Sequence, residues 1–561
     1  MKTDPGTEPR IDIWEKRARS CPAWLPCLCL CIWGMLLRIC AAGKVFPAQG
    51  DASHFVQHGK AFVAMGMEGI SGYWSILPQF LTAWSVKLGW MPQYVLQATT
   101  VGFGVLLVAG VYALAMELTG KRTIAFVAGL LIATNPVLTA SSTTGLSETP
   151  HMALATWSLV LAFAGARKGR VWLFTLAGAV ASVDMYYRPY DLFLYLAGAA
   201  PFILWRMRKN GWRKNAVMLL AGLLVGAICS GPFFAITAMK STGSAGNSKL
   251  VNLAFRKHGL DAKAMYAAKG LHGDDVALSL EIRELQEKGA LGYMWAHRGE
   301  IARDYVRNVA KGLRHLNEHA FEGMFRLGFF WFALASGLCF VAAWTSGRRE
   351  MALYAPTAMV VILGALSIGF VHPRWVMQFL PFYVLLAGAG FKWMTEHISP
   401  VRGRRLVWGI LLAAAFLNGR WAVARLDDEW RQRNLFEVSE RLKTHMDEGE
   451  RLMSFQPELP SLFYATNTLS WMAIPYGPVG EVFAWADMQA VDCIVLNSST
   501  FPHFPIHEIE RVPELVPTPW HEVDRLEFVH DTRFGEERDE YRIYRCTGES
   551  SGEPIAAGMG K

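Results

Sequence analysis

Eleven apolar stretches alternate with polar gaps along this chain. Each is near the length that an α-helix needs to cross a hydrocarbon layer of about 30 Å. The pattern predicts membrane-spanning helices at residues 22–42, 96–117, 123–140, 150–166, 171–187, 190–205, 215–238, 326–345, 351–370, 374–392 and 406–424. The expected fold is therefore an α-helical polytopic membrane protein with about 11 transmembrane helices.

Basic residues are concentrated in every second gap between these stretches. With the long gap at 240–325 set aside, alternate short gaps hold 21 Lys and Arg, and the intervening short gaps hold only five. Basic loops stay preferentially in the cytoplasm, so the N-terminus is expected inside and, with an odd number of spans, the C-terminus outside. The prediction is a multi-pass protein of the inner (plasma) membrane with large outer loops at 44–95 and 240–325.

The composition agrees with a bilayer as the main solvent. Of 561 residues, 52% are hydrophobic and 18% are charged, which is too apolar for a soluble multidomain protein. The net charge of +8 lies mainly in the gaps assigned to the cytoplasm, where it can meet anionic membrane lipids. The charge therefore gives no reason to expect nucleic acid as a partner.

The chain changes character after residue 424. Short β-rich runs at 451–455, 491–496 and 541–545 alternate with amphipathic segments such as 428–447, which predicts a small α/β domain. Two domains are expected: a transmembrane module at 1–424 and an extracytoplasmic α/β domain at 425–561. Cys493 and Cys546 fall in this exported tail, where a disulfide is permitted, but sequence alone does not place them within bridging distance.

An interfacial helix is predicted at residues 52–66, directly after Asp51. One face carries apolar side chains, and the other carries Asp51, His54 and His58. Asp51 is then expected to face water at the outer surface. The three polar side chains have two interpretations: they form a solvated polar face, or they hold a divalent metal, because His at i and i+4 share a helix face and Asp51 could complete three ligands.

Ionisable residues within the membrane body gather where predicted spans meet the outer surface. They are Glu148, Asp184, Arg188, Asp191, His372 and Arg374. Any single one could be a topological anchor or a solvated cap. Glu148, for example, could be an acid favoured by the dipole of the helix that it begins, and a solvated acid there contributes only about 0.3–1 kcal/mol to stability. As a set, carboxylates and cations at one surface indicate a functional site.

Four motifs occur in an order and sidedness that resemble the GT-C glycosyltransferases. They are Asp51 before an interfacial helix, Leu146-Ser147-Glu148 between the third and fourth spans, Tyr187-Arg188-Pro189 after the fifth, and His372-Pro373-Arg374-Trp375 at the tenth. The chain is similar to the lipid A aminoarabinose transferase and protein O-mannosyltransferase types. The similarity runs from residue 22 to about residue 500, because the tail also resembles the soluble periplasmic domain that many members carry.

This resemblance implies an inverting transfer of a sugar from a polyprenyl-phosphate donor to a hydroxyl of a lipid, glycan or protein acceptor at the outer face. It implies that Asp51 is the general base and that Glu148 helps to organise the site. The departing phosphate needs cations, and Arg188 and Arg374 are natural candidates because a guanidinium binds phosphate through a bidentate fork. Further candidate phosphate ligands are His372, Arg256 and Lys257, although the last two could instead form an ordinary exposed basic turn.

Two other classes of protein fit the same topology. A transporter or flippase of lipid-linked sugars would also be polytopic, but such proteins usually carry ionisable groups near the membrane midplane. A non-catalytic partner in a cell-envelope assembly would keep the topology without the reaction. The charges at one surface favour an enzyme. The sequence identifies no certain cofactor for the expected reaction, and a divalent metal is an open alternative.

Overall fold

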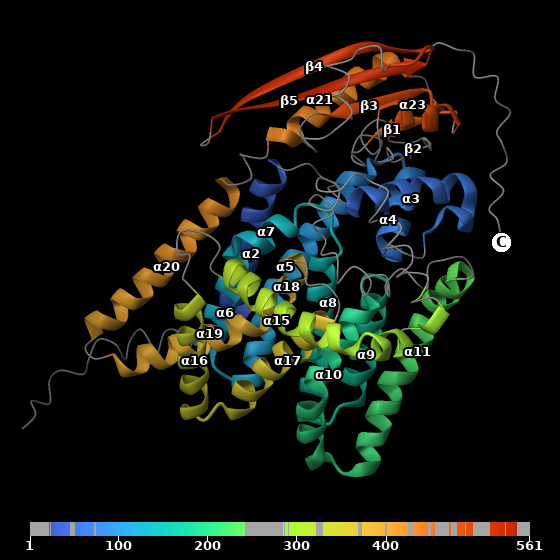
Figure 1. The fold of residues 1–561 in the computed structure, drawn as a ribbon. Coiled ribbons are helices and arrows are strands. Elements are labelled where there is room, and N and C mark those ends of the chain that lie inside the picture. The colour runs from blue at the N-terminus through green and yellow to red at the C-terminus, as the bar shows by residue number, and fades with distance from the viewer. Residues whose placement is uncertain are drawn as a thin grey trace, which may run out of the picture.

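The computed structural model describes residues 22, 24–44, 51–71, 75–241, 284, 287–289, 291–320, 329–368, 373–398, 401–424, 430–446, 450–454, 471–472, 479–488, 490–497, 516–532 and 535–546. Helices dominate up to residue 445, and a small sheet follows (Figure 1). This arrangement confirms the predicted fold class.

Each of the eleven predicted spans overlaps a helix for most of its length. These helices are α2 (Trp24–Ala42), α5 (Pro92–Thr119), α6 (Arg122–Thr134), α8 (Glu148–Lys168), α9 (Val171–Met185), α10 (Pro189–Met207), α11 (Trp212–Ser241), α16 (Phe329–Thr345), α17 (Arg349–Ile368), α19 (Leu380–His397) and α20 (Val401–Ala424). Among the described residues, six helices are long and apolar enough to cross a membrane. A polytopic membrane protein is therefore confirmed, whereas the count of about 11 spans stays a prediction.

The predicted span at 123–140 is wrong as a continuous helix. The structure ends α6 at Thr134 and begins a separate helix, α7 (Pro136–Ser141). Two local causes act together: Pro136 has no N–H to continue the hydrogen bonding of α6, and the side-chain oxygen of Asn135 accepts from the backbone N–H of Leu138 at 3.0 Å. The break turns the chain toward the loop that leads to Glu148.

A layer of helices from outside the predicted spans covers one end of the bundle. It comprises α3 (Asp51–Met65), η1 (Gly66–Gly69), α4 (Ile76–Lys87), α15 (Arg298–Ala320), α18 (Pro373–Val376) and η3 (Met377–Phe379). The helix predicted after Asp51 is thus confirmed. It packs tightly on α4, because a Cβ at Gly59 would lie 1.7 Å from Oγ1 of Thr82, a hydroxyl that donates to the carbonyl of Phe55 at 2.9 Å.

The opposite end of the bundle holds its own charged cluster. The carboxylate of Glu117, near the end of α5, accepts from Arg167 of α8 at 2.6 Å and from Arg206 of α10 at 2.9 Å. The basic connection between α10 and α11, which contains η2 (Arg208–Asn210), lies at this end (Figure 1). Since α8 has 21 residues, about 30 Å of helix separates this cluster from Glu148.

The tail forms a five-stranded sheet in the order β2-β1-β3-β5-β4. Its strands are β1 (Leu452–Ser454), β2 (Trp471–Met472), β3 (Cys493–Asn497), β4 (Trp520–Thr532) and β5 (Gly535–Cys546), accompanied by α21 (Trp430–His445) and α23 (Val479–Met488). β1 pairs in parallel with β2 and β3, whereas β5 pairs antiparallel with β3 and β4. The predicted α/β character is confirmed, and Figure 1 shows the sheet on the same side of the bundle as α3 and α4.

Alternate residues of this sheet pack into two separate clusters. Cys493, Val495 and Ile543 belong to the cluster that includes α21, whereas Ile494 and Tyr544 belong to the cluster that includes α23. Cys546 packs against the α23 cluster, so its side chain and that of Cys493 lie on opposite faces of the sheet. Both cysteines are free for this reason.

Candidate active site

Four of the predicted site residues come together at the end of the bundle that carries α3. Asp51 begins α3, Glu148 begins α8, Arg188 immediately precedes α10, and Arg374 lies on α18. Arg374 donates from Nη2 to Oδ2 of Asp51 at 2.8 Å, and its Nε lies 3.8 Å from Oε1 of Glu148. Arg188 donates from Nη2 to the same Oε1 at 3.1 Å. The result is an alternating chain of two carboxylates and two guanidinium groups.

The two halves of this chain differ in exposure. The side chains of Asp51 and Arg374 are 30% and 33% exposed, whereas that of Glu148 is only 1% exposed. The expectation of a solvated Glu148 is therefore wrong. Residues 141–153 are all buried, and the Arg188 guanidinium compensates the carboxylate that is enclosed with them. Glu148 forms the floor of the site, and Asp51 forms its open side.

The backbone around Arg188 is held against α4. Tyr186 accepts at its carbonyl from the N–H of Ile76 at 2.9 Å, and the hydroxyl of Ser75 donates to the carbonyl of Tyr187 at 2.7 Å. Pro189 then starts α10, because its fixed φ suits the first helical position. The loop is thereby fixed where the Arg188 side chain can reach Glu148.

Carboxylates surround Arg188 on more than one side. Burial alone would lower the pKa of its guanidinium, but the charges of Glu148, Asp191 and Asp51 outweigh this effect and raise the pKa above its ordinary value. Arg188 is therefore a permanent cation in the site.

Two further residues extend the cluster. Asp191 accepts at Oδ2 from Nη1 of Arg188 at 2.8 Å and from Nε2 of Gln378 at 2.9 Å. Asp191 was visible in the sequence only as one of the charges at span ends, and Gln378 was missed. A signal for Gln378 existed: it is a polar residue one helical turn after Arg374 in an otherwise apolar run.

The metal interpretation of the first loop does not fit the arrangement of its side chains. Among the described residues, no three His, Cys, Asp or Glu side chains come together as a metal site. Asp51 bonds to Arg374 instead, and Nδ1 of His58 donates to the carbonyl of Gly69 at 3.3 Å. In the described residues Asp51, His54 and His58 therefore do not form a preformed metal centre, and a role for metal stays a prediction from the sequence.

Three of the candidate phosphate ligands cannot be placed. His372, Arg256 and Lys257 lie outside the described residues. Their roles stay predictions from the sequence.

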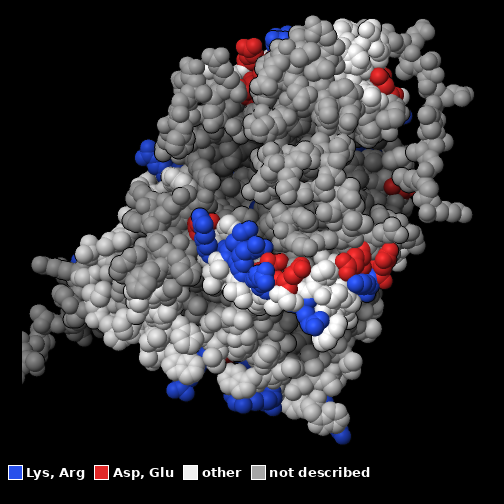
Figure 2. All heavy atoms as spheres, in the orientation of Figure 1, with Lys and Arg blue, Asp and Glu red and all other residues white. Residues whose placement is uncertain are grey.

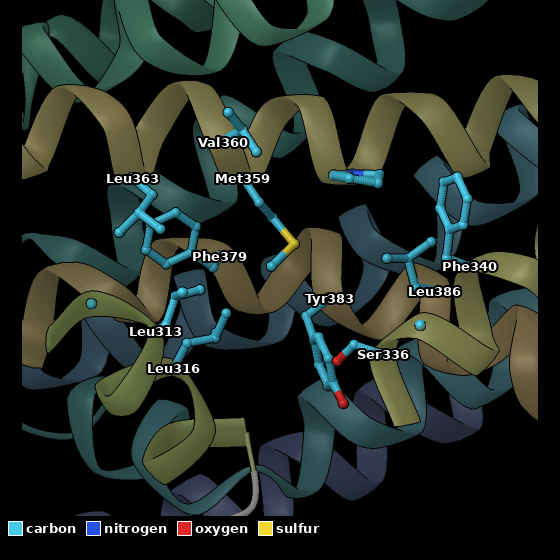
Figure 3. A pocket seen from close by; sticks show the side chains of 13 residues that line it. Leu313, Leu316, Ser336, Phe340, Met359, Val360, Leu363, Phe379, Tyr383 and Leu386 are labelled. Atoms are coloured by element: carbon cyan, nitrogen blue, oxygen red, sulfur yellow. The ribbon is translucent and has the colours of Figure 1, made fainter. Parts of the chain in front are cut away.

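An apolar cavity of about 370 Å³ lies between α15, α16, α17 and α19. Its lining includes Leu316, Phe340, Met359, Leu363, Phe379 and Tyr383, and Figure 3 shows Met359 pointing into the space. Phe379 directly follows Gln378, which bonds to Asp191. The cavity thus begins on the same short segment that carries polar groups of the site, and its size falls within the range of about 300–1,000 Å³ that is usual for ligand pockets.

The outer surface beside the cavity belongs to α15, which packs on α17 and α18. Its exposed basic side chains include Arg307 and Arg314, which are 58% and 77% exposed and pair with Asp304 and Glu318 at 3.0 Å each. The space-filling view in Figure 2 shows Lys, Arg, Asp and Glu mixed on this face. The surface is therefore polar on the outside and apolar toward the cavity.

Comparisons with known proteins place this geometry in context. Residues 75–235 match the family model described as dolichyl-phosphate-mannose-protein mannosyltransferase. Among curated proteins, no sequence matches the chain.

The fold is similar to that of ArnT from Cupriavidus metallidurans. The structure bound to undecaprenyl phosphate is 11% identical, covers 93% of this chain and 98% of its own, and gives a TM-score of 0.51. The apo structure is also 11% identical, covers 91% of this chain and 97% of its own, and gives a TM-score of 0.54. At 11% identity these matches show a shared fold and do not identify the substrates. Together the comparisons show that this chain shares the fold of ArnT and that residues 75–235 resemble the dolichyl-phosphate-mannose-protein mannosyltransferase family.

Proposed function

We propose that this protein is an inverting glycosyltransferase that moves a sugar from a polyprenyl-phosphate donor to an acceptor hydroxyl at the extracytoplasmic face of the membrane. One observation supports it above all: a partly exposed carboxylate, Asp51, contacts a partly exposed guanidinium, Arg374, above a buried pair of Glu148 and Arg188. A proton acceptor and cations for a leaving phosphate thus lie within one site.

The reaction is a single displacement. The acceptor oxygen attacks the anomeric carbon while its proton passes to the Asp51 carboxylate. The bond from the anomeric carbon to the phosphate oxygen breaks, and its electron pair stays on the polyprenyl phosphate. Attack opposite the leaving group inverts the anomeric centre, and Arg374 and Arg188 stabilise the charge that develops on the phosphate.

A lipid-linked donor fits the surroundings of this site. The apolar cavity beside Phe379 offers space for part of a hydrocarbon chain while the phosphate stays near Arg374. The ArnT structure with undecaprenyl phosphate and the mannosyltransferase family match support a donor of the same class. The acceptor class is open among lipid, glycan and protein.

The orientation of the site rests on the charge asymmetry of the loops. The site shares its end of the bundle with the tail sheet, which the basic-residue pattern assigns to the outside (Figure 1). The division into a membrane module at 1–424 and an outer domain at 425–561 belongs to this proposal. A reporter fused after residue 550 should be active outside the cytoplasm, and activity only in the cytoplasm would contradict the whole orientation.

A transfer assay separates the proposed activity from its alternatives. The purified full chain is reconstituted in vesicles with a polyprenyl-phosphate donor that carries a labelled sugar, together with an envelope extract as the source of acceptors. Label appearing on an acceptor supports the glycosyltransferase. Label crossing the bilayer without transfer would indicate a transporter or flippase. If the label is neither transferred nor moved across the bilayer, the protein is an assembly partner.

A further inference from the structure

A buried pair of polar side chains lies directly behind the proposed site. His151 of α8 and Asp184 of α9 are both fully buried, and Nδ1 of His151 lies 2.9 Å and 3.0 Å from the two carboxylate oxygens of Asp184. A carboxylate can only accept, so Nδ1 carries the proton in this bond. The pair connects two helices without contacting the open side of the site.

This pair belongs to a closed ring of contacts. His151 follows Glu148 by one turn of α8, so both point from the same face of that helix. The backbone carbonyl of Asp184 accepts from the N–H of Arg188 at 2.9 Å. The Arg188 side chain returns to α8, where it contacts Glu148 at 3.1 Å and the hydroxyl of Ser147 at 3.3 Å. Each contact therefore constrains the others.

A second connection reaches the same histidine. The ring of Tyr195 packs edge-on against His151 with centroids 5.2 Å apart, and its hydroxyl donates to the carbonyl of Gln378 at 2.8 Å. The Gln378 side chain donates to Asp191, which in turn holds Arg188. Two separate routes thus lead from His151 to the guanidinium of Arg188.

The packing of α8 against α9 does not require the His151–Asp184 hydrogen bond. The hydroxyl of Ser158 already joins the same two helices by donating to the carbonyl of Ala177 at 3.1 Å. The His151–Asp184 bond removes an imidazole and a carboxylate from solvent, which is costly for charged and polar groups. In the part of the chain that the structure describes, Nε2 of His151 has no hydrogen-bond partner at all. What the pair adds is a fixed distance between the start of α8 and the end of α9.

We propose that His151 and Asp184 are positioning residues that hold the Arg188 guanidinium against Glu148 in the geometry that binds the donor phosphate. The pair acts through Arg188 and does not touch the reacting atoms. This inference rests on the proposed function, because it assigns the positioned cation to a polyprenyl-phosphate donor.

Three substitutions at one position test the bond. His151→Asn places an amide N–H near the position of Nδ1 and keeps the contact with Asp184. His151→Gln keeps a polar side chain but places its amide too far along, and His151→Ala removes the group. Ser158→Ala is the matched control, since it deletes another buried bond between α8 and α9, away from the site. If the alanine variant does not fold, the comparison of the Asn and Gln variants decides.

The readouts are the affinity for a polyprenyl phosphate without sugar, the kinetic constants of transfer, and the midpoint of thermal unfolding. We expect His151→Ala and His151→Gln to weaken phosphate binding on the order of 10- to 100-fold through misplacement of Arg188. His151→Asn should recover most of this loss, and Ser158→Ala should lower only the unfolding midpoint.

Two results would overturn the positioning role: unchanged affinity in both His151→Gln and His151→Ala, or an equal loss of affinity in Ser158→Ala. Failure of the proposed function appears differently, because the wild-type protein would then bind no polyprenyl phosphate. That result would remove the donor site and this inference together.

Discussion

Arg374 donates a 2.8 Å hydrogen bond to Asp51 although 323 positions separate them in the sequence. The bond joins α3, a helix of the first loop, to α18 at the start of the segment that continues into α19. Both side chains are about one-third exposed, so ligands can approach the pair from outside. The proton acceptor and the nearest cation of the proposed reaction are therefore in direct contact.

Asp51→Asn should strongly slow transfer while leaving donor binding intact. The amide keeps the shape of the carboxylate, and its oxygen can still accept from Arg374, but it cannot take a proton from the acceptor hydroxyl. The expected loss in turnover is on the order of 10²- to 10⁴-fold. Steady-state transfer assays measure it, with polyprenyl-phosphate titration as the control for an intact site. Near-normal turnover would remove Asp51 from the mechanism.

Arg374→Lys tests whether this cation binds the donor. An ammonium group is a point charge and cannot contact phosphate through two N–H groups of a planar fork, so donor affinity should fall while insertion into the membrane is kept. Titration of a polyprenyl phosphate against both purified proteins gives the answer. Equal affinities would leave Arg374 as a topological anchor, the simpler role that its place at a span end also allows.

Glu148→Gln should impair stability as well as activity, because Glu148 is buried and paired with Arg188. Breaking a buried ion pair from one side typically costs about 3–5 kcal/mol, well above the effect of a solvated helix-start acid. We expect a lower unfolding midpoint and weaker donor binding. Glu117→Gln is the control, since it disturbs ion pairs with Arg167 and Arg206 at the other end of the bundle. Full activity in Glu148→Gln would reduce Glu148 to a structural role.

The burial of Glu148 shows what the sequence could not predict. The helix after Asp51 could be predicted because Phe55 and the apolar residues near it recur on one helical face. This spacing is a local pattern that is typical of an amphipathic helix. Whether the Glu148 carboxylate is exposed to solvent depends instead on Arg188, which lies between α9 and α10 and is distant in the sequence. The sequence could therefore indicate which charges gather at one end but not which of them are enclosed.

The same limit applies to contacts within apolar runs and within the tail. Gln378 was missed because hydropathy averages over neighbours and ignores the direction of one polar side chain. The opposite faces of Cys493 and Cys546 depend on the pairing register of β3 with β5, which places Cys493 opposite Arg545. Register is a property of two strands together, so neither strand alone reveals it.

Lys60 gives a prediction that does not depend on the proposed activity. It is 4% exposed, and its amine has no hydrogen-bond partner within the described ranges; burial lowers its pKa from 10.5 to about 7. Between about pH 7 and 10.5 the unfolded chain keeps a proton that the folded chain has lost, so the free energy of unfolding should rise with pH across this window. Below pH 7 both states are protonated and this contribution is constant.

Lys60→Met should remove this rise and stabilise the protein at pH 7, because the apolar side chain is buried without a charge. The unfolding midpoint of the detergent-solubilised protein between pH 6 and 10 measures both effects. Lys87→Met, at an exposed position near the end of α4, is the control and should change neither. If the unfolding midpoint of Lys60→Met depends on pH in the same way as that of the wild type, the Lys60 amine of the wild type reaches solvent or an anion in the folded protein.

The last prediction concerns Gly104, where α5 passes the buried guanidinium of Arg38. Arg38 lies on α2, is fully buried, and donates from Nη1 to the carbonyls of Gly34 at 3.0 Å and Ala133 at 3.3 Å. A Cβ at Gly104 would lie 2.4 Å from Nε of Arg38 and 2.8 Å from Cβ of Ser142. Neither neighbour can retreat easily, because both are enclosed on all sides.

Gly104→Ala should therefore destabilise the protein by about 1–3 kcal/mol, the usual cost of overpacking a closed site. Gly102→Ala on the same helix is the matched control, since its Cβ would meet nothing within 4 Å and Ala is the better helix former. Thermal unfolding of both variants in detergent compares them directly. If Gly104→Ala proves as stable as Gly102→Ala, Arg38 has room to move, and the close packing of α2 against α5 is looser than the contact distances indicate.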